Sequence, residues 1–364
     1  MEVFLENVTL INWQMIVMWS IGGLLIFLAI KKDMEPSLLL PMGFGAILVN
    51  LPKAGAMEVI GTLFNAGISN ELFPLLLFIG IGAMIDFGPL LSNPKMLLFG
   101  AAAQFGIFFT LSMASLLGFD LTDAASIAII GAADGPTAIV VANHFKTRYI
   151  GAITVAAYSY MALVPIVQPA CIRLITTRKE RMIRMPYNPQ AISKTTRILF
   201  PIIVTVIAGI ASPDSVELIG FLMFGNLLRE CGVLNSLSET AQKVLANLIT
   251  LLLGLTVASK MQAADFLQLK TLMILALGLV AFIFDTFGGV LFAKFLNLFL
   301  KQKINPMVGA AGISAFPMSS RVVHKMGLQE DPNNFLLMHA ASANVAGQIA
   351  SVIAGGLIMA LIAV

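Results

Sequence analysis

Apolar residues fill most of this chain in long stretches, which polar residues, glycines and prolines interrupt at intervals. A helix needs about 20 predominantly apolar residues to cross a bilayer. Stretches near that length predict about ten membrane-spanning helices, at residues 12–30, 37–51, 70–88, 95–118, 149–176, 198–212, 215–229, 242–259, 271–299 and 335–363. The pattern therefore predicts an all-α polytopic membrane protein.

Two further stretches, 123–145 and 304–325, are apolar but contain breaks, with the sequences GAADGPT and GISAFPMSSR. Glycine, proline and polar residues leave backbone groups without helical partners, and a membrane tolerates this only inside protein or beside water. We expect both segments to be re-entrant, because a full crossing near Asp134 would place the basic loop that follows it outside the cell.

Composition and charge support a membrane protein. Hydrophobic residues make up 58% of the 364 residues and charged residues only 11%, whereas about 25% is usual for a soluble domain. The net charge is +3, and the basic residues gather in short segments between apolar runs, so no nucleic-acid partner is expected. Residues 178–197 contain six basic residues and one acidic residue, which places this loop in the cytoplasm, together with KK at 31–32 and KQK at 301–303.

The two halves of the chain resemble each other at a spacing close to 180 residues. GFGAILVN at 43–50 parallels MFGNLLRE at 223–230, LLLFIGIGAM at 75–84 parallels LLLGLTVASK at 251–260, and GAADG at 131–135 parallels GAAGI at 309–313. Weak internal similarity with a broken segment in each half is typical of transporters built from inverted repeats. The alternative is that apolar helices resemble one another by composition alone.

This repeat predicts an elevator-like transporter in which the broken segments move relative to a scaffold. The expected parts are an N-terminal transmembrane helix, a first repeat broken near 131–137, a basic cytoplasmic loop with a linking helix, and a second repeat broken near 305–321. Their boundaries are 1–36, 37–177, 178–214 and 215–364.

Asp134 is the residue that most needs a chemical explanation. An isolated carboxylate at the centre of a bilayer costs at least about 2.5–3.5 kcal/mol, unless it is paired, protonated or bound to a cation. Thr137 lies close by, and the second break supplies Asn305 and Ser314; such oxygens suit a hard monovalent cation. Sodium or a proton is therefore the expected occupant. The alternative is that Asp134 only caps the half-helix that begins at Pro136.

Other polar residues within apolar runs are weaker candidates. Asp285 is predicted to lie mid-helix, where it is either a second cation ligand or the partner of a buried polar contact. Asn344, Gln348 and Ser351 recur on one helical face, in a stretch whose small residues also suit helix packing. We expect Asn344 to be an additional ligand.

GAADGPTAI, together with NPMVGAAGISAFPMSSRV, resembles the membrane beta subunit of the sodium-pumping biotin-dependent decarboxylases. This family includes the oxaloacetate, glutaconyl-CoA and methylmalonyl-CoA decarboxylases, and the resemblance covers nearly the whole chain. The positions that carry it are Asp134, Tyr160 in AYSYMALVP, Asn305, Gly309, Ser314 and Arg321.

The resemblance implies roles for these residues. Asp134 is expected to be a sodium ligand and the coupling carboxylate, and Ser314 to bind sodium with it. Tyr160 is implied to act in the sodium and proton pathway, while Asn305 and Gly309 are implied to belong to the same sodium-binding region.

The family also implies an enzyme of the inner membrane, which decarboxylates carboxybiotin, consumes a proton and exports sodium. Arg321 would receive the carboxylated biotin, which a separate carrier protein holds, because this chain lacks the AMKM-type motif that accepts biotin. A carboxyltransferase subunit and a small membrane subunit are the other implied partners, in an oligomeric assembly. Two alternatives are a sodium-coupled secondary transporter without chemistry and a noncatalytic membrane anchor.

Overall fold

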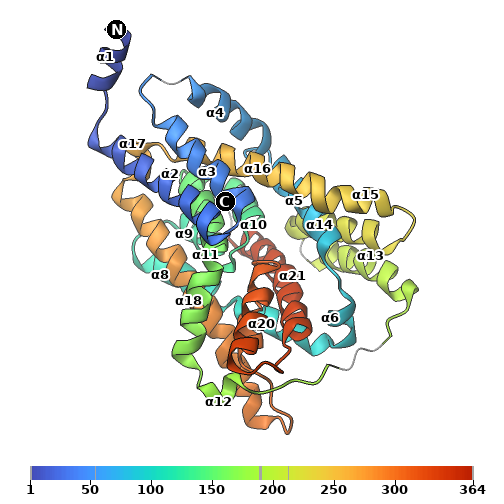
Figure 1. Ribbon diagram of the computed structural model, residues 1–364. Helices are drawn as coiled ribbons and strands as arrows, with labels where there is room; N and C mark the ends of the chain where they lie inside the picture. The colour runs from blue at the N-terminus through green and yellow to red at the C-terminus, as the bar shows by residue number, and fades with distance from the viewer. Residues whose placement is uncertain (1, 54, 188–190, 212, 363–364) are drawn as a thin grey trace.

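The computed structural model describes residues 2–53, 55–187, 191–211 and 213–362, and every regular element within these ranges is helical (Figure 1). The longer helices are α2 (Trp13–Lys32), α3 (Pro36–Val49), α4 (Ala56–Gly67), α5 (Leu72–Met84), α8 (Phe105–Leu116), α10 (Gly135–His144), α11 (Ile150–Ile175), α13 (Lys194–Ala211), α14 (Val216–Glu230), α16 (Ala246–Val257), α18 (Leu269–Phe299), α20 (Met318–Glu330) and α21 (Leu337–Leu361). The shorter segments are α1 (Glu2–Thr9), α6 (Gly88–Ser92), η1 (Pro94–Met96), α7 (Leu97–Ala103), α9 (Leu121–Ala128), η2 (Ile129–Ala132), α12 (Arg178–Arg181), η3 (Pro213–Ser215), α15 (Asn235–Glu239), η4 (Thr240–Leu245), η5 (Ala258–Lys260), α17 (Ala263–Phe266) and α19 (Met307–Ala310).

Six helical stretches in the described part of the chain are long and apolar enough to cross a membrane. They are Trp13–Lys32, Pro94–Leu116, Ile150–Ile175, Asn235–Lys260, Leu269–Phe299 and Leu337–Leu361. Met57–Gly67 and Leu72–Met84 form a pair bent by 63°, which is either a broken span or a re-entrant loop. The all-α membrane fold is thus confirmed. By length and composition alone six helices qualify as spans, or seven if the bent pair is one span, and shorter apolar helices such as Pro36–Val49 lie beside them. The end of the helix expected at 335–363 lies outside the described residues.

The helices pack as two bundles (Figure 1). Bundle A comprises α2–α5 and α13–α17, and lies across the upper part of the view. Bundle B comprises α7–α11 and α18–α21, and extends from the middle of the view to its lower part. The bundles meet where α10 packs against α5 and where α21 packs against α14 and η3.

Each bundle combines helices from both halves of the chain. In bundle A, α3 packs against α16 and α5 packs against α14. Glycines make both contacts close: a methyl group on Gly254 would lie 2.7 Å from the carbonyl oxygen of Leu38, and one on Gly225 would clash with the carbonyl of Ile79. In bundle B, α11 packs against α18, and α21 packs against α7.

Two buried asparagines fasten the ends of helices in bundle A. Asn50, at the end of α3, donates to the carbonyl of Met261 and accepts from the amide of Ala263, both at 2.8 Å. Asn226 on α14 donates to the carbonyl of Ile85 at 2.9 Å. Each side chain therefore crosses from one half of the chain to a helix end in the other half.

We predict that Asn50→Ala destabilises bundle A, because it leaves the amide of Ala263 and the carbonyl of Met261 unpaired in a buried position. The expected loss is about 1–3 kcal/mol of unfolding free energy, measured as a lower thermal midpoint of the detergent-solubilised chain. Asn65→Ala, at an exposed position on α4, is the control and should leave the midpoint unchanged. Equal midpoints for the two variants would contradict the assigned role of Asn50.

Candidate functional site

The first broken segment presents a carboxylate at the start of a half-helix. The chain leaves η2 through Ala133, whose backbone is left-handed (φ 52°), and Asp134 then caps α10. The amide of Thr137 donates to Asp134 Oδ1 at 3.4 Å and its hydroxyl donates to Oδ2 at 2.8 Å. Pro136 suits the first turn because it has no N–H that needs a partner.

The second broken segment lies directly against the first. Between α19 and α20, the amide of Ser314 donates to the carbonyl of Ala132 at 3.1 Å. The hydroxyl of Ser314 donates to the carbonyl of Gly347 on α21 at 2.9 Å. A backbone hydrogen bond therefore links the two breaks, and a side-chain hydrogen bond attaches their junction to α21.

Helix α21 supplies the remaining polar groups of this junction. Ser351 donates from its hydroxyl to Asp134 Oδ2 at 2.8 Å. Asn344 donates to the carbonyl of Ile313 at 2.6 Å, and Gln348 donates to the carbonyl of Ser314. The spacing of these three side chains along the helix brings them to the two breaks.

The junction is rich in oxygen atoms and its carboxylate has no cationic partner among the described residues. Asp134 is 3% exposed, and its hydrogen-bond donors in the described chain are neutral. The side-chain oxygens of Asn344 and Gln348 are buried without a hydrogen-bond donor. Buried acceptors normally have partners, and several oxygens around one carboxylate suit a hard cation such as sodium. The residues present thus fit a small monovalent cation.

Two tyrosines of α11 lie on different sides of that helix. Tyr160, the expected pathway residue, donates its hydroxyl to the carbonyl of Leu275 on α18. Tyr158 is fully buried, its ring lies against Gly135, and its hydroxyl has no partner among the described residues. No feature of the sequence favours Tyr158 over Tyr160, yet Tyr158 is the tyrosine beside the Asp134 segment.

Asp285 lies on α18 and caps a different helix. Its Oδ1 accepts from the amide of Gly106 at 2.5 Å, in the first turn of α8, where the stretch from α7 to α8 is interrupted at Gln104. Its Oδ2 has no hydrogen-bond partner in the described chain and faces Gly131, just before the first break. The structure therefore places Asp285 in a buried polar contact next to the breaks.

Three other expected site residues lie apart from the hydrogen bonds around Asp134. Gly309 on α19 packs backbone to backbone against Gly289 on α18, where a side chain on either would clash. Arg321 lies on the exposed side of α20 and forms no ion pair among the described residues. Asn305 precedes α19 and binds the basic loop.

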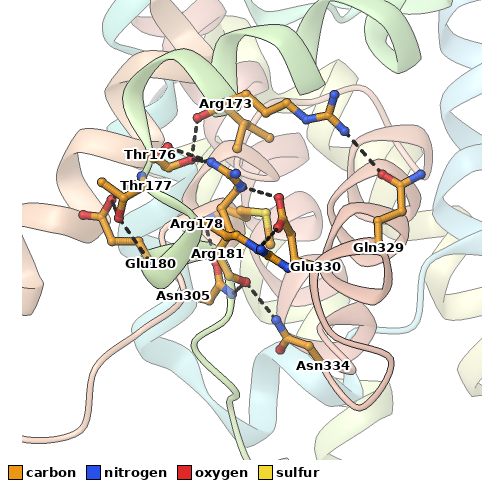
Figure 2. Close-up of polar contacts among 12 residues, drawn as sticks. Arg173, Thr176, Thr177, Arg178, Glu180, Arg181, Asn305, Gln329, Glu330 and Asn334 are labelled. Atoms are coloured by element: carbon orange, nitrogen blue, oxygen red, sulfur yellow. Dashed lines mark hydrogen bonds and ion pairs between the residues drawn. The ribbon is translucent and has the colours of Figure 1, made fainter.

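Figure 2 shows how that loop is held. Asn305 donates to the carbonyls of Arg181 and Ile183 at 2.7 and 2.8 Å, and Asn334 donates to the carbonyl of Arg181 at 2.9 Å. The guanidinium of Arg181 pairs with Glu330 at 2.6 Å. The first turn of the basic loop is thus fastened to the start of the second broken segment, to the end of α20 and to the turn that follows α20.

These observations define the class of protein: a multi-pass membrane protein with a buried carboxylate where two broken segments meet, an arrangement typical of ion-coupled transport proteins. Residues 14–362 match the family described as the Na+-transporting oxaloacetate decarboxylase beta subunit, and the chain belongs to this family. It is a subunit of a sodium-transporting decarboxylase of the inner membrane.

Named relatives cover nearly the whole chain. The methylmalonyl-CoA decarboxylase subunit beta of Veillonella parvula is 47% identical over 346 residues, which are 95% of this chain and 92% of the relative. The glutaconyl-CoA decarboxylase subunit beta of Acidaminococcus fermentans is 47% identical over 353 residues, 96% of this chain and 94% of the relative. The oxaloacetate decarboxylase beta chain 2 of Salmonella typhi is 44% identical over an aligned length of 407 positions, gaps included, and the alignment covers 94% of each chain.

We predict that acid loosens the docked loop. The hydrogen bond from Arg184 to Asp331, at 2.5 Å, holds the pKa of Asp331 below its ordinary value of about 4. Because the pKa of Asp331 is lower in the folded state, its ionised form stabilises the docked loop at pH values above the unfolded-state pKa. This stabilisation is lost as pH falls through the folded-state pKa. Proteolysis within residues 182–187 should therefore accelerate below about pH 4.

The control is Arg184→Gln, which removes the guanidinium that lowers the pKa of Asp331. In this variant cleavage should already be faster at neutral pH and should depend less on acid. An acid-stable protease is required, and cleavage that is equally slow at pH 3 and pH 7 in the parent chain would contradict the role of this pair.

Proposed function

We propose that this chain decarboxylates carboxybiotin presented by a separate carrier protein and uses the reaction to export sodium. The observation that carries the proposal is the buried Asp134 carboxylate, whose hydrogen-bond donors are neutral, beside a second break where two buried amide oxygens lack donors, in a chain of this family. The relatives are named as beta subunits, which indicates that their assemblies contain further subunits. We propose a carboxyltransferase subunit and a small membrane subunit as the partners of this chain.

The ligand set we propose for sodium is Asp134, Thr137, Ser314 and Asn344, with Gln348 and Ser351 added. Sodium and a proton would compete for the Asp134 carboxylate, because either one neutralises the buried charge. Because the Asp134 carboxylate would hold either sodium or a proton but not both, movement of sodium would be coupled to proton uptake.

Decarboxylation breaks the bond between the biotin ureido nitrogen and the carboxylate carbon. Carbon dioxide leaves, the electron pair stays on nitrogen, and nitrogen takes up one proton. The exposed Arg321 interacts with the carboxylate of Glu35. We propose that it also meets the arriving carboxylate, since a guanidinium binds carboxylates through two parallel hydrogen bonds. Tyr160 remains the proposed relay of the proton; Asn305 and Gly309 would shape the second break rather than bind sodium directly.

We further propose ten spanning helices, arranged as inverted repeats with the boundaries expected from the sequence. Contacts within the two bundles support this: α3 with α16 mirrors α14 with α5, and α11 with α18 mirrors α21 with α7. Bundle B would carry the ion past bundle A, as an elevator, because both breaks belong to bundle B.

The ends of corresponding helices support the inverted orientation. The hydrogen bond from Asn50 to the carbonyl of Met261 places the end of α3 beside Met261. The end of α14 lies beside the start of α13, where Glu230 pairs with Arg197 at 3.6 Å, and α13 follows the basic loop. If that loop is cytoplasmic, α14 ends at the cytoplasmic face. Helix α3 begins just after the basic pair at 31–32, which is also expected in the cytoplasm, so α3 would end at the other face.

We predict that Asp134→Asn raises the sodium concentration needed for half-maximal decarboxylation by roughly a hundredfold, since a loss of about 3 kcal/mol corresponds to two factors of ten. In the parent chain, acid should raise this concentration by competition; in the variant this pH dependence should largely disappear. The measurement is turnover of free carboxybiotin by the full-length chain, at varied sodium between about pH 5.5 and 8.5.

Asp285→Asn is the matched control, because it changes another buried carboxylate but keeps the oxygen that accepts from Gly106. It should retain the sodium dependence of the parent. If Asp134→Asn keeps both affinity and pH dependence, Asp134 is only a helix cap; if Asp285→Asn shifts them instead, Asp285 holds the cation. A parent chain that transports sodium without turning over carboxybiotin would favour a secondary transporter.

We predict that single cysteines placed just after α3 and α14 react from opposite faces of the membrane. Leu51 and Val233 are 40% and 82% exposed, so Leu51→Cys and Val233→Cys should be accessible once Cys231 has been replaced by serine. A membrane-impermeant maleimide applied to intact cells should label only Leu51→Cys. Labelling of both from one side would refute the inverted arrangement.

A further inference from the structure

A cavity of about 520 Å³ opens on the face of the molecule that carries the basic loop. It lies between α7, the end of α18, the turn 301–304 and the start of α21. A second cavity of about 170 Å³ adjoins it, and the two share Asn93, Pro186 and His339 as lining residues. The larger volume falls within the range of about 300–1,000 Å³ that is typical of small-molecule sites.

The mouth of this cavity is positively charged. Lys95, Lys301 and Lys303 line it, and none of its described lining residues is acidic. The turn that bears two of these lysines is fixed, because Asn297 donates to the carbonyl of Ile304 and accepts from its amide, both at 2.7 Å. A preformed basic mouth favours an anionic ligand.

His339 lies at the inner end, between the two cavities. The residue is 7% exposed and its Nε2 has no hydrogen-bond partner among the described residues. Its other ring nitrogen faces the backbone of Met185 and Pro186, and Tyr187 packs edge-on against the ring at 5.6 Å between centroids. If that other nitrogen carries the proton, Nε2 is a buried acceptor that requires a donor.

The wall between the lysines and the histidine is apolar, with Met96, Phe99 and Leu296. A complementary ligand thus has an anionic group, an N–H donor and an apolar body. A carboxylated ureido ring has all three: the carboxylate on one nitrogen, the remaining N–H on the other, and the fused sulfur ring.

We propose that this cavity holds the carboxylated ring of carrier-borne biotin, with the lysines at its carboxylate and His339 Nε2 at its remaining N–H. This inference rests on the proposed function and adds a binding site to it. Arg321 does not line the cavity, so its contact with the arriving carboxylate is separate from the contacts made there.

The first test replaces Lys95, Lys301 and Lys303 together by glutamine in the full-length chain in nanodiscs. We expect KM for free carboxybiotin to rise about tenfold or more, which corresponds to the loss of one charge-assisted hydrogen bond. Half-saturating sodium should stay unchanged. The control replaces three exposed lysines of other segments, Lys31, Lys32 and Lys325, and changes the net charge equally.

The second test is direct binding of free biotin, which retains the N–H donors and the apolar body. His339→Phe keeps an aromatic ring against Tyr187 but removes the acceptor, so biotin binding should weaken; His339→Gln, which can present an oxygen, should weaken it less. This readout does not require turnover. It therefore still tests the cavity if the parent chain fails to decarboxylate carboxybiotin, the result that would overturn the proposed function.

Two results would overturn the cavity proposal. One is a KM in the triple-lysine variant within about twofold of the control variant, with biotin binding unaffected by His339→Phe. The other is a defect that appears only in nanodiscs of anionic phospholipid and disappears in neutral lipid, which would identify the lysines as a lipid headgroup site.

Discussion

A buried carboxylate without a fixed cation is the constraint on which this structure depends. Asp134 is almost completely removed from solvent and is held by hydroxyl and amide donors alone. Such donors orient the carboxylate but do not cancel its charge, which costs at least about 2.5–3.5 kcal/mol near the centre of a bilayer. A lysine or arginine in contact would neutralise it permanently. The described contacts include none. In the proposed function a mobile cation would neutralise the carboxylate, and occupancy would then depend on the concentrations of sodium and protons.

This arrangement requires broken backbone to approach closely packed helices, and small residues make that approach possible. Gly347 on α21 faces Gly312 and Ile313 at the second break, and an added methyl group would lie 2.8 Å from the Ile313 carbonyl oxygen. The neighbouring Asn344 and Gln348 then reach the carbonyls of the same break. The small residue Gly347 lets α21 approach the second break closely. At this distance the polar side chains of α21 reach the carbonyls of the break and form hydrogen bonds with them.

Much of this was accessible from the sequence, because hydropathy reports burial in lipid directly. Hydropathy located the long helices, and glycine, proline and polar residues within apolar runs located the two breaks. A charged residue within an apolar run identified Asp134 as a candidate. Hydropathy missed α4 and the interruption at Gln104, since apolar composition does not reveal a bend. Side-chain partners were also inaccessible: Tyr158 and Tyr160 point about 200° apart on one helix, and only packing shows that Tyr158 lies against Gly135.

Helix α21 connects the two regions that the proposed reaction needs. His339 lies in its first turn and Ser351 beside Asp134, twelve residues further on, or about 18 Å along the axis at about 1.5 Å per residue. At this separation the biotin ring cannot touch the ion, so coupling has to be a free energy transmitted through the position of α21 and the breaks it contacts. Such coupling is reciprocal: if sodium at Asp134 tightens ring binding by some factor, the bound ring must tighten sodium binding by the same factor. In the proposed reaction, loss of carbon dioxide would change the ligand at one end of α21, and the sodium affinity at the other end would change with it.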